Sequence, residues 1–141
     1  RNQMLWLTAE SDNTRRWNAQ TLGRLKYEQG TAPSFLYFFD WHSPVHNNRM
    51  GAYHTLDIPF VLYNLDVGAS MTGAAQSRYQ LGHVMSAAWA AFARTGNPNH
   101  SDMPTWPAFD PDDYPTMIFG EGVRIMEDPN REERLALMDL K

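Results

Sequence analysis

The amino-acid sequence predicts an α/β fold of which this chain supplies only a part. Residues 35–39 form the uninterrupted apolar run Phe-Leu-Tyr-Phe-Phe, which is typical of a strand buried on both faces in a mostly parallel sheet. Residues 74–95 have a helical apolar period, as expected of a helix that packs on such a sheet. A central strand needs neighbours on both sides, yet the 141 residues offer few other strands. We therefore expect the rest of the sheet to lie outside 1–141.

The first helix is expected from about Ser11 or Asp12 to Gln29. Serine and aspartate are preferred N-cap residues, and Gly30 suits the left-handed conformation that ends many helices. The apolar residues of this helix are irregularly spaced: Trp17, Leu22 and Leu25.

The helix expected at about 74–95 has a clear buried face. Its apolar residues recur at three- and four-residue steps and form one stripe. The members of the stripe are Leu81, Val84, Met85, Ala88, Trp89 and Phe92. Arg94 suits the negative pole of the helix, and Gly96 followed by Pro98 ends it.

The C-terminal part predicts a hairpin and a last helix. Residues 116–119 and 123–126 are two short strand-like segments about Gly-Glu-Gly, the composition of a hairpin turn. Asp128 is expected to cap a final helix with Pro129 at its first position.

Composition excludes several classes of protein. Hydrophobic residues make up 43% and charged residues 20%, which is typical of a globular chain rather than a disordered one. The net charge of −4 is mixed along the chain without a basic stripe, which argues against nucleic acid as a partner. No apolar run approaches the ~20 residues that a membrane-spanning helix needs.

The chain contains no cysteine, so disulfides and thiolate metal sites are excluded. This fits a reducing compartment and favours the cytoplasm, although an N-terminal signal is not observable in this segment. The chain begins Arg-Asn-Gln without an initiator Met, so we expect it to be a piece of a longer protein.

His54 is the candidate with the clearest chemical setting. Gly51 and Ala52 are small, so a backbone or a substrate can come close to His54. Pro59 prevents a continuous helix through the segment, which predicts a loop histidine. An imidazole with its unperturbed pKa near 6.5 is suited to carry protons at neutral pH. Taken on its own, the residue is better explained as a structural histidine in a turn.

A metal site built from His42, His46 and His54 is disfavoured. Pro44 lies between the first two and interrupts the helix that their spacing would require. The sequence thus does not predict a metal site. A separate motif, Asn99-His100-Ser101, fits a glycosylation acceptor that only a secreted eukaryotic protein would use.

Five segments, in this order, resemble the C-terminal part of the type-B carboxylesterases, the cholinesterase-like branch of the α/β-hydrolases. They are Phe35–Trp41, Gly51–Val61, Trp89–Asn99, Trp106–Asp110 and Thr116–Phe119. The resemblance implies the late strands of a central, mostly parallel sheet and its packing helices, roughly the last quarter of such an enzyme.

In this family the histidine that matches His54 is the base of a Ser-His-Glu triad. The resemblance therefore implies a serine ester hydrolase that acts through an acyl-enzyme on a small-molecule ester, without a cofactor. The family's Gly-x-Ser-x-Gly elbow is absent, because the nearest segment, Gly68–Thr72, lacks the second glycine and does not follow a predicted strand. The nucleophile, acid and oxyanion loop would come from an N-terminal remainder, and this chain alone should be inactive.

Three neighbours of His54 are candidates for supporting roles. Asp57 is expected to bond backbone amides in the turn that aims the histidine, rather than to act as the triad acid. Tyr53 and Leu56 either line the acyl or alcohol pocket or belong to the core.

Two alternatives to an enzyme remain at this stage. One is a non-catalytic relative with an incomplete triad, used for adhesion or binding. The other is a separate interaction module that forms a homo-oligomer through residues 129–141. Either way, a partial sheet should present apolar surface to solvent.

Overall fold

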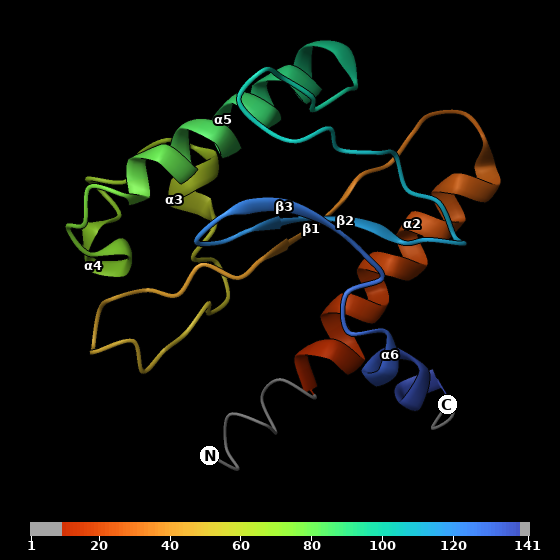
Figure 1. Cartoon of the computed structure of the whole chain (residues 1–141), viewed down its shortest axis with the longest axis horizontal. Helices are drawn as coiled ribbons and strands as arrows, with labels where there is room; N and C mark the ends of the chain where they lie inside the picture. Colours follow the sequence, from red (N-terminus) through yellow and green to blue (C-terminus); the bar gives the residue numbers. More distant parts are fainter. Residues whose placement is uncertain (1–9, 139–141) are drawn as a thin grey trace. The chain divides into compact units, whose positions relative to one another are not determined.

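The computed structural model describes residues 10–138, which form a small sheet and several helices (Figure 1). In chain order the elements are η1 (Asp12–Arg16), α2 (Trp17–Gln29), β1 (Leu36–Phe39), α3 (Ile58–Val61), α4 (Ala69–Thr72), α5 (Arg78–Thr95), β2 (Pro115–Phe119), β3 (Val123–Glu127) and α6 (Arg131–Met138). The chain divides into two compact units, which we describe separately. The described residues of the first unit are 10–36, 107–116 and 126–138, and those of the second are 37–106 and 117–125.

In the first unit, the predicted first helix is present but begins earlier than expected. Glu10 and Ser11 are already helical and lead through the π-helical turn η1 into α2, so neither Ser11 nor Asp12 is the N-cap. The predicted end is confirmed. Gly30 has a φ of 67° and donates its N–H to the carbonyl of Tyr27 at 3.0 Å.

The face that α2 buries is not made by its leucines. Leu22 and Leu25 are 68% and 51% exposed, whereas Gln20 and Gly23 are buried. Gly23 lies so close to the ring of Phe109 that an added Cβ would stand 3.2 Å from a ring carbon. The helix therefore approaches this ring through a residue without a side chain and leaves apolar surface in solvent.

The last helix begins at Arg131, so the expectation that Asp128 caps it with Pro129 at the first position is wrong. The carbonyl of Asn130 accepts the N–H of Arg134 at 3.0 Å, the first hydrogen bond of α6. The carboxylate of Asp128 instead accepts two hydrogen bonds from the guanidinium of Arg134, at 2.9 and 2.5 Å. The aspartate stabilises the start of the helix through a side chain one turn further on.

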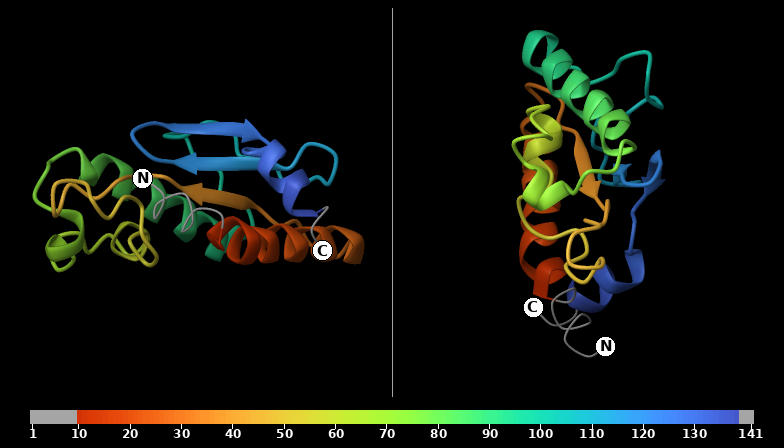
Figure 2. Two further views of the ribbon diagram at one scale, coloured as in Figure 1. Left: turned by 90° about the horizontal axis from the view of Figure 1, so that it is seen from below. Right: turned by 90° about the vertical axis from the view of Figure 1, so that its left-hand side faces the viewer.

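The three strands form a mixed sheet in the order β1-β2-β3, and the predicted hairpin of β2 and β3 is confirmed. Figure 2 shows the arrows of β1 and β2 pointing the same way and that of β3 pointing back. All five residues of β2 are buried, whereas Tyr37 and Phe38 of β1 are each 39% exposed. The expectation that the run 35–39 is buried on both faces is therefore not met. Within the described residues β1 pairs with β2 alone and forms an edge.

In the second unit, α5 packs against α3 and has the predicted buried stripe at its centre (Figure 1). Leu81, Met85 and Ala88 are at most 6% exposed, although Phe92 at the end of the stripe is 46% exposed. The helix starts at Arg78 and not near residue 74. Its predicted end is confirmed at Gly96, which has a φ of 75°. Among residues 10–138, no helix is long and apolar enough to cross a membrane.

Asn99 fastens the loop after α5. Its side-chain oxygen accepts the N–H of Trp106 at 2.6 Å, and its amide nitrogen donates to the carbonyl of the same residue at 2.9 Å and to Asn97 Oδ1 at 2.7 Å. Both amide hydrogens are thus engaged. Glycosylation at Asn99 would replace one of these hydrogens and break its bond, so the structure favours a structural role for this motif.

Candidate active site

The segment that leads to His54 folds back on itself through an unusual backbone. His46, Asn47 and Asn48 all have positive φ values between 55° and 60°, and Gly51 has a φ of 60°. Left-handed backbone is uncommon for residues with a side chain, although asparagine and histidine tolerate it better than most. The N–H of Ser43 closes this loop on the carbonyl of Gly51 at 3.2 Å.

His54 lies in a turn that runs directly into α3, and its side chain is exposed. Two hydrogen bonds define this turn: Leu56 N–H to the carbonyl of Tyr53, and Ile58 N–H to the carbonyl of Thr55, both at 3.2 Å. Thr55 has a φ of 72°, a strained value for a β-branched residue. Such strain persists only where the surrounding structure holds it, and it is concentrated at functional sites.

Buried apolar side chains hold the turn in place. Leu56 has no exposed surface, and Phe60 on α3 is equally buried. The ring of Phe60 contacts those of Phe39 and Trp41, with centroids 5.3 and 4.9 Å apart. Of the two readings for Leu56, the structure therefore favours core packing over contact with a ligand.

A hydrogen bond also holds the N-terminal side of the turn. The hydroxyl of Tyr53 donates to the carbonyl of Met71 at 3.4 Å, and the buried Ser43 donates to the same carbonyl at 2.6 Å. Tyr53 is only partly buried.

On the C-terminal side, Asp57 does not bond the amides of its own turn, which corrects the expectation for this residue. No side-chain capping bond is made at the start of α3. Its Oδ2 accepts a hydrogen bond of 2.8 Å from the hydroxyl of Tyr37 on β1. Partial burial, and then this hydrogen bond and charge, raise the pKa of the Tyr37 phenol, so it stays protonated at neutral pH.

The other histidines do not form a second site. Among residues 10–138, no three His, Asp or Glu side chains gather as metal ligands would. His83 Nε2 lies 3.4 Å from Asp102 Oδ2, and the hydroxyl of Ser101 donates to the other oxygen of that aspartate at 3.0 Å. The carboxylate thus stands between serine and histidine. A nucleophile and its base must instead bond each other directly.

The segment Gly68–Thr72, the nearest approach to an elbow motif, consists of the short helix α4 and its N-cap residue Gly68. It follows turn residues and not a strand, and Ser70 within it is exposed on the helix. The hydroxyl of Thr72 lies within hydrogen-bond distance of two carbonyls, Leu65 at 3.3 Å and Gly68 at 3.1 Å. A nucleophile elbow needs a sharp turn from strand to helix, so this segment does not supply one.

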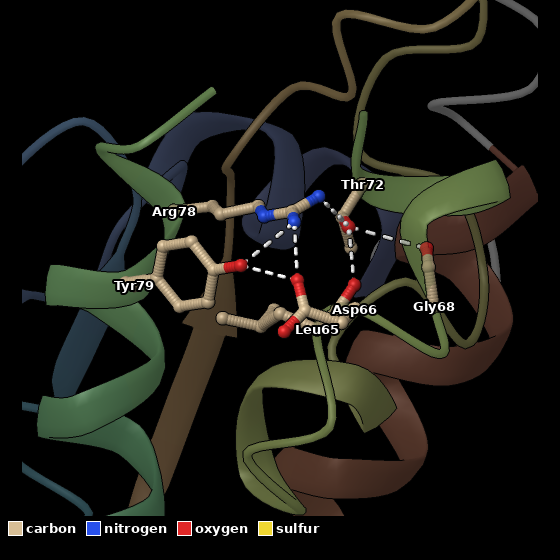
Figure 3. Close-up of polar contacts among 6 residues, drawn as sticks. All are labelled: Leu65, Asp66, Gly68, Thr72, Arg78 and Tyr79. Carbon is tan, nitrogen blue, oxygen red and sulfur yellow. Dashed lines mark hydrogen bonds and ion pairs between the residues drawn. The ribbon is translucent and has the colours of Figure 1, made fainter. Parts of the chain in front are cut away.

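A polar network that the sequence analysis missed fastens α4 to the start of α5 (Figure 3). Arg78 is only 4% exposed and donates to Thr72 Oγ1 at 3.1 Å and to Asp66 Oδ1 at 3.0 Å. It also donates to the hydroxyl of Tyr79 at 3.0 Å, which in turn donates to Asp66. A cation at the first residue of a helix opposes the helix dipole, so Arg78 needs an acidic partner there; the predicted helix began near residue 74, and the sequence therefore did not show this position.

This chain is similar to known esterases and hydrolases. Residues 7–138 match the model of the carboxylesterase family. The chain is 38% identical over 114 residues to the para-nitrobenzyl esterase of Bacillus subtilis (strain 168). The alignment covers 78% of this chain and 22% of that protein. It is 33% identical over 113 residues to the phenmedipham hydrolase of Pseudarthrobacter oxydans. That alignment covers 77% of this chain and 23% of the hydrolase.

Solved structures give the same result. A thermophilic PNB esterase has a TM-score of 0.66 and 39% identity. The match covers 75% of this chain and 22% of that esterase. An esterase from Clostridium hathewayi has a TM-score of 0.70 and 26% identity. The match covers 79% of this chain and 22% of that esterase. The chain therefore spans less than a quarter of the length of these relatives and has the fold of an incomplete α/β-hydrolase domain. It belongs to the carboxylesterase family.

Proposed function

We propose that residues 1–141 are the C-terminal segment of a carboxylic-ester hydrolase and that they supply its general base, His54. The parent protein would contribute the serine nucleophile, the acid that orients the imidazole and the oxyanion hole. The observation that carries the proposal is the exposed His54 on a strained turn that is held from both sides by buried or hydrogen-bonded neighbours.

In this proposal His54 removes the proton from the serine hydroxyl as the serine attacks the ester carbonyl. The protonated imidazole then gives that proton to the departing alcohol, and the serine is left acylated. His54 next takes a proton from water, which attacks the acyl-enzyme, and it returns that proton to the serine oxygen as the carboxylic acid is released. The chemistry needs no cofactor, and Tyr53 is the neighbour whose exposed part could contact the ester.

The alternatives are less well supported. The relatives named above are esterases and hydrolases, which does not favour an adhesion protein. Asp57 is bonded to Tyr37, which leaves the role of triad acid to the upstream polypeptide. Ser70 lies on a short helix and lacks the elbow, so we expect the 141-residue chain to have no ester hydrolysis of its own.

The test is hydrolysis of a para-nitrophenyl ester by the parent protein with His54→Ala. We expect kcat to fall on the order of a thousandfold or more, as for the loss of a triad member. His42→Ala is the matched control, because it removes another exposed imidazole from the preceding loop and should leave kcat unchanged. Equal activity of the two variants would rule out the role assigned to His54.

A further inference from the structure

Tyr37 is held in place by three elements of the second unit. It lies on β1, and its ring makes edge-to-face contacts with Trp89 of α5, at 5.0 Å between centroids, and with Phe119 of β2, at 6.1 Å. Its hydroxyl therefore has a well-defined position, from which it donates to Asp57 Oδ2 at 2.8 Å.

Asp57 belongs to the turn that carries His54 and lies three residues after it. The backbone carbonyl of Asp57 accepts the N–H groups of Phe60 and Val61, both at 3.0 Å, and so begins α3. Its carboxylate is not used for capping. The side chain thus connects the turn to β1, while the backbone connects it to α3.

We propose that Tyr37 is a positioning residue for His54 and acts through its hydrogen bond to Asp57. This inference rests on the proposed function of His54 as the base. The strained backbone at Thr55 tends to relax, and the link to β1 opposes that relaxation. A base must lie within hydrogen-bond reach of the serine, and a displacement of about 1 Å can lower the rate by a hundredfold.

The first test compares Tyr37→Phe with Tyr27→Phe in the parent protein. Tyr37→Phe removes the hydroxyl and keeps the ring that contacts Trp89 and Phe119. Tyr27 is an exposed tyrosine on α2 and serves as the matched control. We expect kcat per titrated active site to fall roughly tenfold in Tyr37→Phe with KM unchanged, the effect of losing one hydrogen bond to a charged group. A smaller yield of folded protein with unchanged kcat would show a structural role only and would overturn the inference.

Variants at Asp57 test the same hydrogen bond by changing its acceptor. They also test the positioning role if Tyr37→Phe does not fold. Asp57→Asn keeps an oxygen that can accept from Tyr37, whereas Asp57→Ala does not. We therefore expect Asp57→Asn to retain clearly more activity than Asp57→Ala. The double variant Tyr37→Phe/Asp57→Ala should be no slower than the slower single variant, because both changes break one bond. Additive losses, or equal activities of the two Asp57 variants, would contradict the inference.

The two proposals fail in different ways. If His54→Ala keeps full activity, the proposed function is wrong whatever Tyr37 does. If His54→Ala is inactive while Tyr37→Phe matches Tyr27→Phe, the function stands and the positioning role of Tyr37 is wrong.

Discussion

The ion pair of Asp128 and Arg134 is expected to determine whether α6 stays in place. The two side chains are 5% and 11% exposed and share two hydrogen bonds of 2.9 and 2.5 Å. The guanidinium also lies over the ring of Tyr114 at 4.5 Å, and its hydrogen bonds to Asp128 raise the pKa of Arg134. Removing one partner of a buried pair leaves an uncompensated charge, which destabilises by about 3–5 kcal/mol.

Arg134→Met keeps most of the side-chain volume and removes the charge. Local opening of α6 should then be easier by about 3 kcal/mol, so its backbone amides should exchange hydrogen for deuterium on the order of a hundredfold faster. Mass spectrometry of peptides from residues 131–138 measures this rate in the parent protein.

Arg131→Ala is the control, because Arg131 is 63% exposed and lies 3.7 Å from the same carboxylate. An exposed pair contributes ~0–1 kcal/mol, so exchange should change by a factor of about five at most. Arg134→Lys should be intermediate, since it keeps the charge and loses the two-pronged geometry. Equal acceleration in Arg131→Ala and Arg134→Met would refute the argument from burial.

Two further outcomes follow from the second unit. Gly120→Ala should lower the melting temperature by about 2–4 °C, because the added Cβ would overlap Asp40 Oδ1, so that this side chain must move and lose its 3.2 Å ion pair with Arg124. Gly122→Ala in the same turn meets nothing within 4 Å and should melt like the unsubstituted protein; similar losses in both variants would contradict this packing argument. The raised pKa of Tyr37 means that the unfolded state loses this proton first as pH rises, so the stability linked to it is complete below about pH 10 and declines above. Melting temperatures from pH 9 to 11 should therefore fall less steeply in Tyr37→Phe than in Tyr27→Phe, and parallel curves would exclude the effect.

Elements set by local sequence were predictable. The stripe on α5 and the stop at Gly96 depend on residues within a few turns of one another, and the hairpin of β2 and β3 depends on its own turn. The burial of residues 35–39 was predicted wrongly for this chain because it depends on neighbouring strands. The hydrophobic run indicates how a complete sheet would bury the strand, and this chain covers less than a quarter of its relatives.

Side-chain hydrogen bonds without a capping or periodic pattern could not be predicted. An aspartate often accepts hydrogen bonds from backbone amides close to it in sequence. The sequence therefore suggested bonding of turn amides for Asp57 and helix capping for Asp128. Each is bonded instead by a side chain that the fold brings near, Tyr37 in one case and Arg134 in the other. A bond to a tyrosine twenty residues earlier has no periodic signature, so only the coordinates identify it.

The geometry of the His54 turn is encoded within this segment even though the proposed reaction is not. The contacts that we find holding the turn come from residues 37–72, apart from the aromatic rings that support Tyr37. They are the hydrogen bond to Asp57, the bond from Tyr53 to Met71 and the burial of Leu56. By contrast, β1 lacks a second neighbour among the described residues, and its Tyr37 and Phe38 keep apolar surface in solvent. If the proposed function holds, the remainder of an α/β-hydrolase would cover that surface and bring a serine to a His54 turn that already has its conformation. We therefore expect binding of the remainder to change the burial of β1 more than the conformation of residues 53–58.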